Sequence, residues 1–521
     1  MRQETPMFKS SLSTAVPAGL AVKEMWIRAG IGAGTAALAG MASVVWMPHG
    51  PATAMQALFV LASGLIIGLF AGLCMRSRWA GLLAPLAYVA AVELAHLGAT
   101  QPTVGPIRLD NAYGILAFFL GRGFHGMVGI LPMVYGAALA GRLIEAGALR
   151  RAAGRPALPV QWWLSVILPG MIIAALAVWI ALPASTPPIL DANGDPVPGS
   201  IAELTTVRIG GQDQGLMIRG YSVDKPVLLY LSGGPGQSSL PYPRVIFEDI
   251  SQDFIVVGWD QRGTGKSYAA LDPVSDLTLE QMVTDTIEVT QYLRQRFDAD
   301  KIYLLGESWG TTLGVLAAQR APELYYGFIG SGQMVSQRET DRRLYYDVLA
   351  LAERNGDTHL AETMRAYGEP PYADLPYGNA FVMGYYEQLS RPYTPPQAYI
   401  QRGQAANLGP FGVFGSEYNL VEKVNVLRGL EDMFTVLYPQ IQGIDFRRDV
   451  PRLDVPVYIL DGEAELSARR DLALEWYGQL EAPVKHLYSF ENAGHSVAFE
   501  QYAAFHKILV EDVLPETYPA Q

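Results

Sequence analysis

The sequence has little cysteine and little charge. Its 521 residues include one cysteine, Cys74, so no disulfide can form within the chain. Only 17% of the residues are charged while half are hydrophobic, which predicts a membrane-embedded part joined to a soluble part. The net charge of −12 argues against a nucleic-acid partner, because proteins that bind nucleic acids carry basic surfaces. The seven histidines form no cluster with cysteine, so we expect neither a metal nor another cofactor.

The few charges are unevenly distributed. Residues 1–182 contain 12 Lys and Arg against 5 Asp and Glu, whereas residues 183–521 contain 26 against 45. The chain therefore combines a basic apolar part with an acidic polar part.

Long apolar runs are confined to the first 182 residues. A helix that crosses a bilayer needs about 20 mostly apolar residues. Four stretches meet this requirement: Ala29–Met47, Ala57–Met75, Ala80–Leu97 and Trp163–Leu182. A fifth lies within Ala112–Ala140, where Gly123–Ala140 is the clean span and Ala112–Gly121 is a candidate interfacial or re-entrant piece. We expect about five transmembrane helices, with six as the alternative. A cleaved signal peptide fits poorly, because the first apolar run is long and more follow it.

The positions of Lys and Arg predict the orientation, because cytoplasmic loops are enriched in them. Basic residues lie in the N-terminal tail, after the second span and before the last one, whereas Pro48–Thr53 has none and Gly98–Asn111 has only Arg108. With five helices every basic loop falls on the cytoplasmic side, and residues 183–521 lie outside the cytoplasm. A sixth helix would reverse that placement.

The soluble part begins after a proline-rich segment. Residues 183–200 contain five prolines, which favours an extended spacer. We therefore divide the chain into a transmembrane domain at residues 1–182, a linker at 183–200 and a soluble domain at 201–521.

Short, continuous apolar runs recur in the soluble part. They are Val227–Leu231, Phe254–Trp259, Ile302–Leu305, Tyr325–Ile329, Val455–Leu460 and His486–Phe490. Such runs are typical of parallel strands that are buried on both faces. A helical pattern at Leu279–Phe297, with a capping box at Thr278 and Gln281, lies between two of them. The order predicts an α/β fold. The alternation stops at about residues 334–450, which we interpret as a helical lid or as an ordinary helical layer.

The sharpest motif is a G-x-S-x-G at Gly306–Gly310, with Ser308 at its centre. It follows the expected strand Ile302–Leu305 and precedes a helix-like run at Thr311–Gln319. This is the context of a nucleophile elbow, in which a tight strand-to-helix turn exposes the serine hydroxyl. Ser308 is thus the candidate nucleophile.

A second motif, Ser232–Gly236 (SGGPG), follows the strand Val227–Leu231. A glycine loop of this kind can present backbone N–H groups to an oxyanion, and the residue after the nucleophile supplies the usual second donor. We predict an oxyanion hole at Gly234 and Trp309, against the alternative of a plain Gly/Pro turn.

A serine nucleophile needs a base, and imidazole is suited to that near neutral pH. His495 follows the last expected strand and comes after the serine in the chain, as a catalytic histidine should. The acid that orients it should follow the strand Val455–Leu460. The candidates are Asp461, Glu463, Glu465 and Asp471.

Together these residues resemble the proline iminopeptidase family of α/β-hydrolases, over roughly residues 200–515. Asp260–Ser267 (DQRGTGKS) matches the family's DQRGxGxS run, and we interpret its Asp260 and Arg262 as structural ties. Three positions depart from the family pattern: Ser232 replaces the His of HGGPG, Glu307 replaces a Gly of GGSWG, and Glu465 stands where the G-x-x-D acid is usual. The resemblance implies an α/β-hydrolase fold with a helical lid, and Glu465 as the acid.

The resemblance also implies release of an N-terminal residue from small peptides. Recognition of the free amine would need an acidic side chain, and we place Glu500 and Ser232 as substrate-binding candidates. Further acids are available in the lid region: Glu369, Asp374, Glu387 and Glu417.

Three functions compete on the sequence alone. The first is a membrane-anchored serine aminopeptidase that works through an acyl-enzyme, and the second is an esterase or lipid hydrolase with the same triad. The third is a membrane sensor or transporter-like protein whose hydrolase domain is inactive. The expected partners are a small peptide or ester and the lipid bilayer, and the sequence leaves the oligomeric state open.

Overall fold

The computed structural model describes residues 18–77, 79–153 and 160–519. These residues form two compact units, here called the helical unit and the sheet unit. The helical unit comprises the described residues up to Pro48, together with Leu58–Leu97 and His125–Ala177. The sheet unit comprises His49–Ala57, Gly98–Phe124 and the described residues from Val178 onward. Two stretches that lie between apolar helices in the sequence thus belong to the sheet unit.

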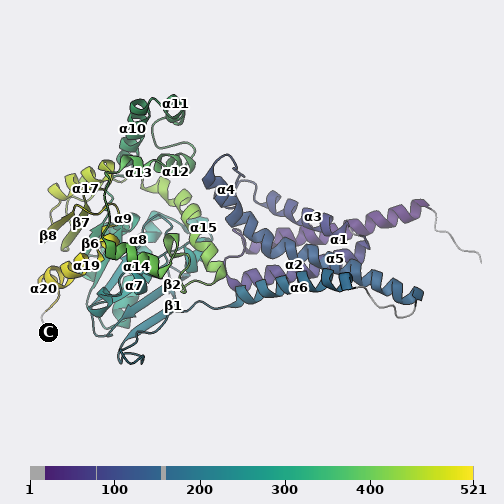
Figure 1. Ribbon diagram of the computed structural model, residues 1–521. Coiled ribbons are helices and arrows are strands. Elements are labelled where there is room, and N and C mark those ends of the chain that lie inside the picture. The colour runs from purple at the N-terminus through teal and green to yellow at the C-terminus, as the bar shows by residue number, and fades with distance from the viewer. Residues whose placement is uncertain (1–17, 78, 154–159, 520–521) are drawn as a thin grey trace, which may run out of the picture. The chain divides into compact units, whose positions relative to one another are not determined.

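Long helices account for the apolar runs of the first 182 residues (Figure 1). They are α1 (Ala18–Trp46), α2 (Ala54–Met75), α3 (Ala80–Ala95), α4 (Ala112–Phe118), the π-helical turn η1 (Phe119–Gly123), α5 (Phe124–Ala153) and α6 (Val160–Ala181). The chain stays helical from α4 through α5. By length and composition four spans could cross a membrane, at Val22–Trp46, Ala54–Met75, Ala112–Gly147 and Val160–Ala181, and Ala80–Ala95 is a shorter apolar helix.

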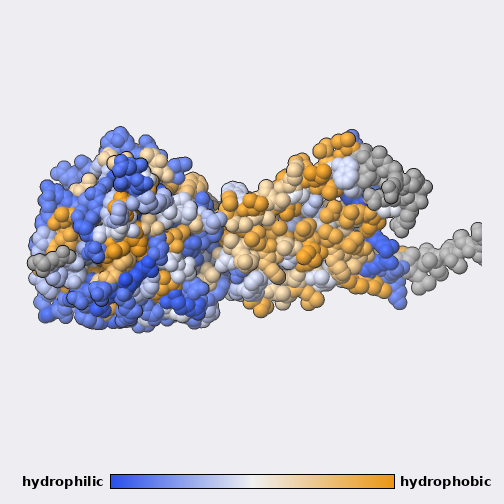
Figure 2. All heavy atoms as spheres, turned by 90° about the horizontal axis from the view of Figure 1, so that it is seen from below, coloured by the Kyte–Doolittle hydropathy of each residue, from blue (hydrophilic) through white to orange (hydrophobic). Residues whose placement is uncertain are grey.

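Glycine lets the helices of the helical unit approach closely. A Cβ on Gly68 of α2 would lie 1.9 Å from the carbonyl oxygen of Met133 in α5, and one on Gly136 would lie 2.3 Å from that of Leu65. Small residues at helix contacts are characteristic of packing in lipid. On the face that Figure 2 shows, the outer surface of these helices is largely hydrophobic, as lipid contact requires.

The sheet unit is built on eight strands in the order β1-β2-β4-β3-β5-β6-β7-β8. Their bounds are β1 Ile201–Ile209, β2 Gln212–Gly220, β3 Val227–Leu231, β4 Ile255–Trp259, β5 Ile302–Glu307, β6 Tyr325–Ser331, β7 Val457–Gly462 and β8 Lys485–Phe490. The strands β3 to β8 pair in parallel, and β1 and β2 form an antiparallel hairpin that joins β4. This is the α/β-hydrolase arrangement, so the expected fold class is confirmed, and the hairpin makes the sheet mixed.

Helices and loops cover both faces of the sheet. Alternate residues of each central strand point to opposite sides, so each face contributes to a buried cluster of its own. Leu229, Val257 and Leu304 belong to one buried apolar cluster, whereas Leu228 and Val256 belong to another. The helices between β3 and β6 are α7 (Tyr242–Val245), α8 (Leu279–Arg296) and α9 (Trp309–Arg320), with 3-10 turns η2 (Ile250–Gln252), η3 (Gly265–Leu271), η4 (Val274–Asp276) and η5 (Pro322–Leu324).

A long insertion separates β6 from β7, and the expected lid at about 334–450 falls within it (Figure 1). Its elements are α10 (Gln337–Asn355), α11 (Thr358–Tyr367), α12 (Tyr377–Met383), α13 (Tyr386–Leu389), α14 (Gln397–Ala406), η6 (Pro410–Gly412), α15 (Leu420–Leu437), η7 (Tyr438–Ile441) and α16 (Phe446–Asp449). The chain ends with α17 (Ser467–Gln479), α18 (Val497–Glu500), α19 (Tyr502–Ile508), the π-helical turn η8 (Leu509–Val513) and α20 (Leu514–Thr517).

Candidate active site

Ser308 lies at the turn between β5 and α9. Its backbone has φ 53° and ψ −120°, a left-handed conformation that is rare for a residue with a side chain. The flanking glycines explain the motif, because a Cβ on Gly306 would lie 2.6 Å from the Gly310 carbonyl oxygen, and one on Gly310 would lie 1.9 Å from that of Leu231. The turn is therefore the strained elbow that the motif predicts.

The glycine loop Ser232–Gly236 lies directly against this turn. A Cβ on Gly233 would come within 3.2 Å of the Cβ of Ser308. Gly234 has φ +112°, which glycine adopts at no steric cost. Trp309 is the first residue of α9, where a backbone N–H has no partner within the helix. Gly234 and Trp309 therefore border the serine from two sides with backbone groups suited to an oxyanion.

Side-chain hydrogen bonds hold the loop and the elbow together. The indole N–H of Trp309 donates to Oε1 of Gln261 at 3.0 Å, and the Gln261 amide donates to the Ser232 carbonyl oxygen at 3.2 Å. The buried Ser232 hydroxyl in turn donates to the Gln237 carbonyl oxygen at 2.7 Å. Ser232 thus braces the glycine loop, and the DQRG run supplies the link to the elbow.

Asp260 and Arg262 act as the structural ties that we expected. The Asp260 carboxylate accepts hydrogen bonds from the backbone N–H groups of Ser239 and Lys266. Burial raises the pKa of Asp260 to about 7 despite these donors. Arg262 forms a fully buried ion pair with Asp285 at 2.9 Å and donates to the Gly210 carbonyl oxygen.

His495 lies in the loop after β8, next to the elbow. Its ring atoms Nδ1 and Cε1 lie 2.9 Å from the position that a Cβ on Gly332 would occupy. Ser331, the residue before Gly332, accepts a hydrogen bond from the Ser308 N–H through its carbonyl oxygen. The hydroxyl of Ser496 also donates to Oε1 of Glu307 at 2.6 Å. The residue before the serine is thus bonded to the residue after the histidine, and both candidates lie at one edge of the sheet.

Glu465 is the carboxylate that contacts the histidine. It is bonded to Nδ1 of His495, it accepts the Leu466 N–H at 2.7 Å, and Arg469 lies 3.6 Å away. Burial alone would raise the pKa of Glu465. The charge and hydrogen bond of His495, together with Arg469, lower it to about 2. Glu465 is therefore ionised across the physiological range and holds the proton of the imidazole on Nδ1.

The other acid candidates have different surroundings. Asp461 pairs with Arg470 at 2.8 Å and accepts the Ser489 hydroxyl at 2.9 Å. Glu463 lies 3.5 Å from Arg391, and Asp471 is exposed on α17. The longer glutamate of the G-x-x-E loop is thus the one that reaches the imidazole.

A cavity of about 330 Å³ opens at the serine, a size near the lower end of ligand pockets. Ser308, Gly234 and Trp309 form one end of its lining. The insertion supplies most of the remaining wall, which is largely apolar and includes Met383, Phe411, Leu430, Phe434, Tyr438 and Ile441. The geometry therefore offers a small, mainly apolar chamber beside the nucleophile.

One buried carboxylate, Asp341 on α10, also lines this cavity. It is 3% exposed. It accepts the Tyr438 hydroxyl at 2.6 Å and amide donors from Gln442 and Gln337 at 3.2 and 3.4 Å. Burial raises the pKa of Asp341 to about 6 although these donors oppose the shift. The sequence reasoning missed Asp341. Its spacing from Leu344 and Val348, at i+3 and i+7, could have placed it on the buried face of the helix.

The acids proposed from the sequence for amine recognition have other partners. Glu500 accepts the Gly494 N–H and the Tyr393 hydroxyl, both at 2.9 Å, so it supports the loop that carries His495. Glu417 is fully buried against Arg244, and Asp374 pairs with Arg108. Glu369 accepts the Tyr346 hydroxyl, and Glu387 is exposed on α13.

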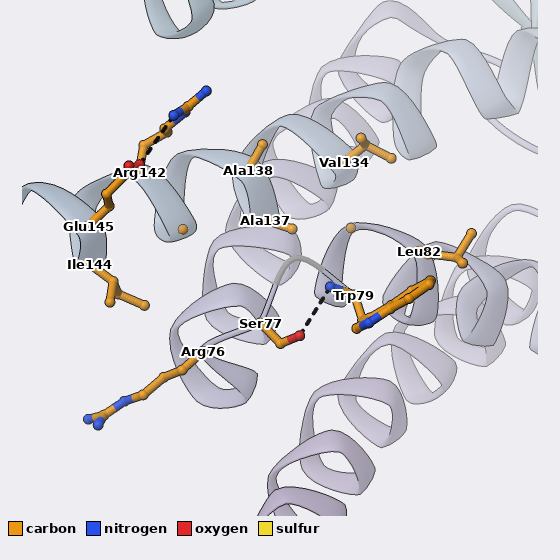
Figure 3. A pocket seen from close by; sticks show the side chains of 12 residues that line it. Arg76, Ser77, Trp79, Leu82, Val134, Ala137, Ala138, Arg142, Ile144 and Glu145 are labelled. Atoms are coloured by element: carbon orange, nitrogen blue, oxygen red, sulfur yellow. Dashed lines mark hydrogen bonds and ion pairs between the residues drawn. The ribbon is translucent and has the colours of Figure 1, made fainter. Parts of the chain in front are cut away.

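A second and larger cavity, of about 700 Å³, lies within the helical unit (Figure 3). Its wall includes Trp79, Leu82, Val134 and two arginines, Arg76 and Arg142. Arg142 pairs with Glu145, and Figure 3 shows Arg76 extending away from that pair. This lining offers no nucleophile with a base, so the cavity at Ser308 is the candidate active site. Within the described part of the chain no group of three His, Cys, Asp or Glu side chains could hold a metal ion.

Comparison with known proteins agrees with this geometry. The profile of the alpha/beta hydrolase fold family matches residues 226–502. A probable aminopeptidase from Bacillus subtilis (strain 168) is 30% identical over 308 residues, which are 59% of this chain and 94% of that protein. A proline iminopeptidase from Lactobacillus delbrueckii subsp. lactis is 24% identical over 298 residues, which are 56% of this chain and 91% of that protein.

Among solved structures, a proline iminopeptidase-related protein from Thermus thermophilus is similar to this chain. The match has a TM-score of 0.43 and 20% sequence identity, and it covers 62% of this chain and all of that one.

Proposed function

The chain belongs to the α/β-hydrolase fold family, as a proline iminopeptidase-like member, and we propose that it is a membrane-anchored serine aminopeptidase that releases single N-terminal residues from small peptides. The observation that carries this proposal is the Asp341 carboxylate in the cavity that also contains Ser308. A carboxylate held there is a partner for the ammonium group of a peptide, which an esterase does not need.

The covalent step uses Ser308 and His495. Nε2 of His495 takes the proton of Ser308 as its oxygen attacks the carbonyl carbon of the first residue, while Glu465 stabilises the imidazolium that forms. The peptide C–N bond then breaks, and His495 returns the proton to the leaving amine. Water hydrolyses the resulting ester on Ser308, with His495 again as the base.

The backbone N–H groups of Gly234 and Trp309 stabilise the negative charge that develops on the carbonyl oxygen. Loss of one such donor costs about 100- to 1,000-fold in turnover in serine hydrolases. The hydrogen bonds through Gln261 keep both donors in place before the substrate arrives, which favours the transition state because no reorganisation is needed during the reaction.

Substrate selection follows from the rest of the cavity. The apolar wall accepts the side chain of the first residue, which includes the ring of proline. The ammonium group pairs with Asp341, whose four hydrogen-bond donors, from Tyr438, Gln442, Gln337 and Asn379, fix its position. The small volume of about 330 Å³ favours one residue over a long acyl chain.

The helical unit serves as the membrane anchor in this proposal. Its support is the set of four long apolar helices and the hydrophobic outer surface in Figure 2. The extracytoplasmic placement of the hydrolase requires a fifth span, for which the shorter apolar helix Ala80–Ala95 is the candidate, and the distribution of Lys and Arg favours this placement.

The substrate class is tested with purified full-length protein and three substrates of similar size: prolyl-naphthylamide, acetyl-prolyl-naphthylamide and a short-chain nitrophenyl ester. We expect cleavage of the free-amine substrate and about a tenfold or greater loss on acetylation, because the ammonium group then no longer pairs with a buried carboxylate. Fast ester turnover without amide cleavage would instead assign the site to an esterase.

The catalytic residues are tested in the same assays with a fluorophosphonate label. Ser308→Ala should lose both labelling and turnover. Glu465→Gln should lower kcat by several orders of magnitude, as loss of the orienting acid does in serine proteases, whereas Asp461→Asn serves as its matched control. Full labelling of Ser308→Ala would exclude the serine mechanism, and near-normal activity of Glu465→Gln would exclude that residue as the acid.

A further inference from the structure

Helix α15 has two opposite faces with different neighbours. Leu430 and Phe434 line the cavity at Ser308. Asn425, Arg428 and Asp432, at spacings i, i+3 and i+7, share another face of the helix. Arg428 and Asp432 are both fully buried, so their charges must be compensated by nearby groups.

Two segments of the first 182 residues provide much of that compensation, and both belong to the same sheet unit as α15. The first joins α1 to α2, and the second comprises the loop after α3 together with α4 and η1. The first is His49–Ala57. Its Pro51 carbonyl oxygen accepts a hydrogen bond from Arg428 at 3.1 Å, and its Ala52 carbonyl oxygen accepts one from Asn425 at 2.7 Å. His49 also contacts Asp272 through Nδ1 at 3.0 Å.

The second segment is Gly98–Phe124, which binds Asp432. The backbone N–H of Thr103 donates to Oδ1 at 3.2 Å and its hydroxyl donates to Oδ2 at 2.7 Å. Tyr268 of the sheet unit donates to the same Oδ2 at 2.7 Å. Arg122 ties the segment to itself through the carbonyl oxygens of Val104 and Gly105, at 3.0 and 2.8 Å.

The same helix touches the candidate oxyanion loop through backbone atoms. A Cβ on Gly236, two residues after Gly234, would lie 2.4 Å from the Gly429 carbonyl oxygen and 2.9 Å from the Cα of Leu430. A Cβ on Gly429 would lie 2.7 Å from the carbonyl oxygen of Gly263 in the DQRG run. Close backbone contact of this kind transmits a displacement directly, since no flexible side chain lies between.

We propose that the segments His49–Ala57 and Gly98–Phe124 are part of the hydrolase, because through Arg428 and Asp432 they hold α15 in the position that sets the oxyanion loop and one wall of the cavity. Thr103, Arg428 and Asp432 are positioning residues in this arrangement. The proposal rests on the serine mechanism above and adds that these two segments are required for the full kcat. It also gives these segments a role beyond connecting membrane spans.

Three conservative substitutions in the full-length protein test this. Thr103→Val removes one donor to Asp432 from the segment Gly98–Phe124. Tyr268→Phe removes a donor to the same oxygen from η3, and Asp432→Asn removes the charge. We expect Thr103→Val to lower kcat by about tenfold, which is a part of the loss seen when an oxyanion donor is deleted. We expect Asp432→Asn to lower kcat further.

A transition-state analogue separates positioning from a general structural defect. Prolyl-boronic acid places a negative oxygen in the oxyanion hole, so its affinity should fall by the same factor as kcat/KM. The affinity for free proline, measured by competition, depends on the cavity wall without the oxyanion hole and should fall by a smaller factor than the boronate affinity. Fluorophosphonate titration counts the intact active sites, so that unfolded protein is not mistaken for slow enzyme. Thr206→Val and Asp213→Asn, on the exposed surface of β1 and β2, are the matched controls.

Two results would overturn the proposal. One is an unchanged kcat and boronate affinity in both Thr103→Val and Asp432→Asn. The other is an effect of Tyr268→Phe alone, since residues from Val178 onward would then hold α15 without the two segments. Failure of the wild-type protein to react with fluorophosphonate at Ser308 would instead refute the serine mechanism. If the enzyme proves to be an esterase, ester turnover provides the same test.

Discussion

Asp341 and Glu465 are both buried carboxylates, yet their pKa values shift in opposite directions. Burial dominates for Asp341 and raises its pKa to about 6, although its hydroxyl and amide donors and the charge of Arg469 oppose the shift. Glu465 lies beside His495 and Arg469, and their charges lower its pKa to about 2 despite burial. The first group titrates near the working range of an enzyme, whereas the second stays ionised.

The titration of Asp341 predicts a pH dependence that is specific to substrates with a free amine. Below about pH 6 the carboxyl group is protonated and no longer pairs with an ammonium group, so kcat/KM should fall by about tenfold per pH unit. For the nitrophenyl ester, which has no amine, this acid limb should be absent. Protonation of the catalytic base lowers turnover of both substrates alike, so the ratio of their pH profiles isolates Asp341.

Asp341→Asn is the variant for this experiment. It should raise KM for prolyl-naphthylamide, flatten the ratio of the two profiles and leave ester turnover nearly unchanged. The free energy of unfolding depends on pH in the opposite direction. Because the folded protein binds the Asp341 proton more tightly than the unfolded chain does, this proton stabilises the fold below pH 3.8. The stabilisation is lost as the pH rises to about 6. An amine-specific limb that persists in Asp341→Asn would exclude this residue as the amine partner.

Among the elements, the strands followed directly from their composition. The continuous apolar run at Val227–Leu231 is β3 residue for residue, and those at residues 302–305 and 486–490 agree with β5 and β8 within two residues. Strands buried on both faces have no polar positions, so their sequence alone identifies them. The hairpin β1–β2 was not predicted, because its first strand has no continuous apolar run and most of its residues are only half-buried.

The turn between β5 and α9 carries a stability prediction. Gly310 is helical, and glycine to alanine normally stabilises a helix by about 0.5–1 kcal/mol. Gly310→Ala should instead destabilise the protein by about 1–3 kcal/mol or more, because its Cβ would stand 1.9 Å from the Leu231 carbonyl oxygen in the packed core.

Gly478→Ala in α17 is the matched control, since no atom lies within 4 Å of its new Cβ. Urea unfolding of both purified variants, followed by tryptophan fluorescence, measures the difference. Equal midpoints for the two variants would show that the elbow tolerates a side chain at Gly310.

For the whole molecule, the predicted orientation is open to a direct test with cysteine labelling. Cys74 is the only cysteine in the sequence, so a Cys74→Ser background contains no other thiol. Ser275→Cys, exposed in the sheet unit, should react in intact cells with a membrane-impermeant maleimide. Lys23→Cys, near the N-terminal tail, should react only after the cells are opened. If neither cysteine reacts until the cells are opened, both ends lie in the cytoplasm and the number of spans is even.

Local sequence signals were enough to predict the α/β-hydrolase class, the apolar helices, the elbow at Ser308 and the loops that carry His495 and Gly234. Each of these depends on local composition, strand period or a glycine that a tight turn requires, and such signals lie within a few neighbouring residues. They left four carboxylates as possible partners of His495, and only the family resemblance favoured Glu465.

The groups that meet across long stretches of chain are known from the folded structure alone. The contact of Glu465 with His495, the place of Asp341 in the cavity and the bond from Thr103 to Asp432, 329 residues away, have no local signature. A buried charge needs a partner, but the sequence does not say which one, because the choice depends on how separate elements pack. For the same reason two segments of the membrane half were found within the hydrolase unit only when the chain was folded.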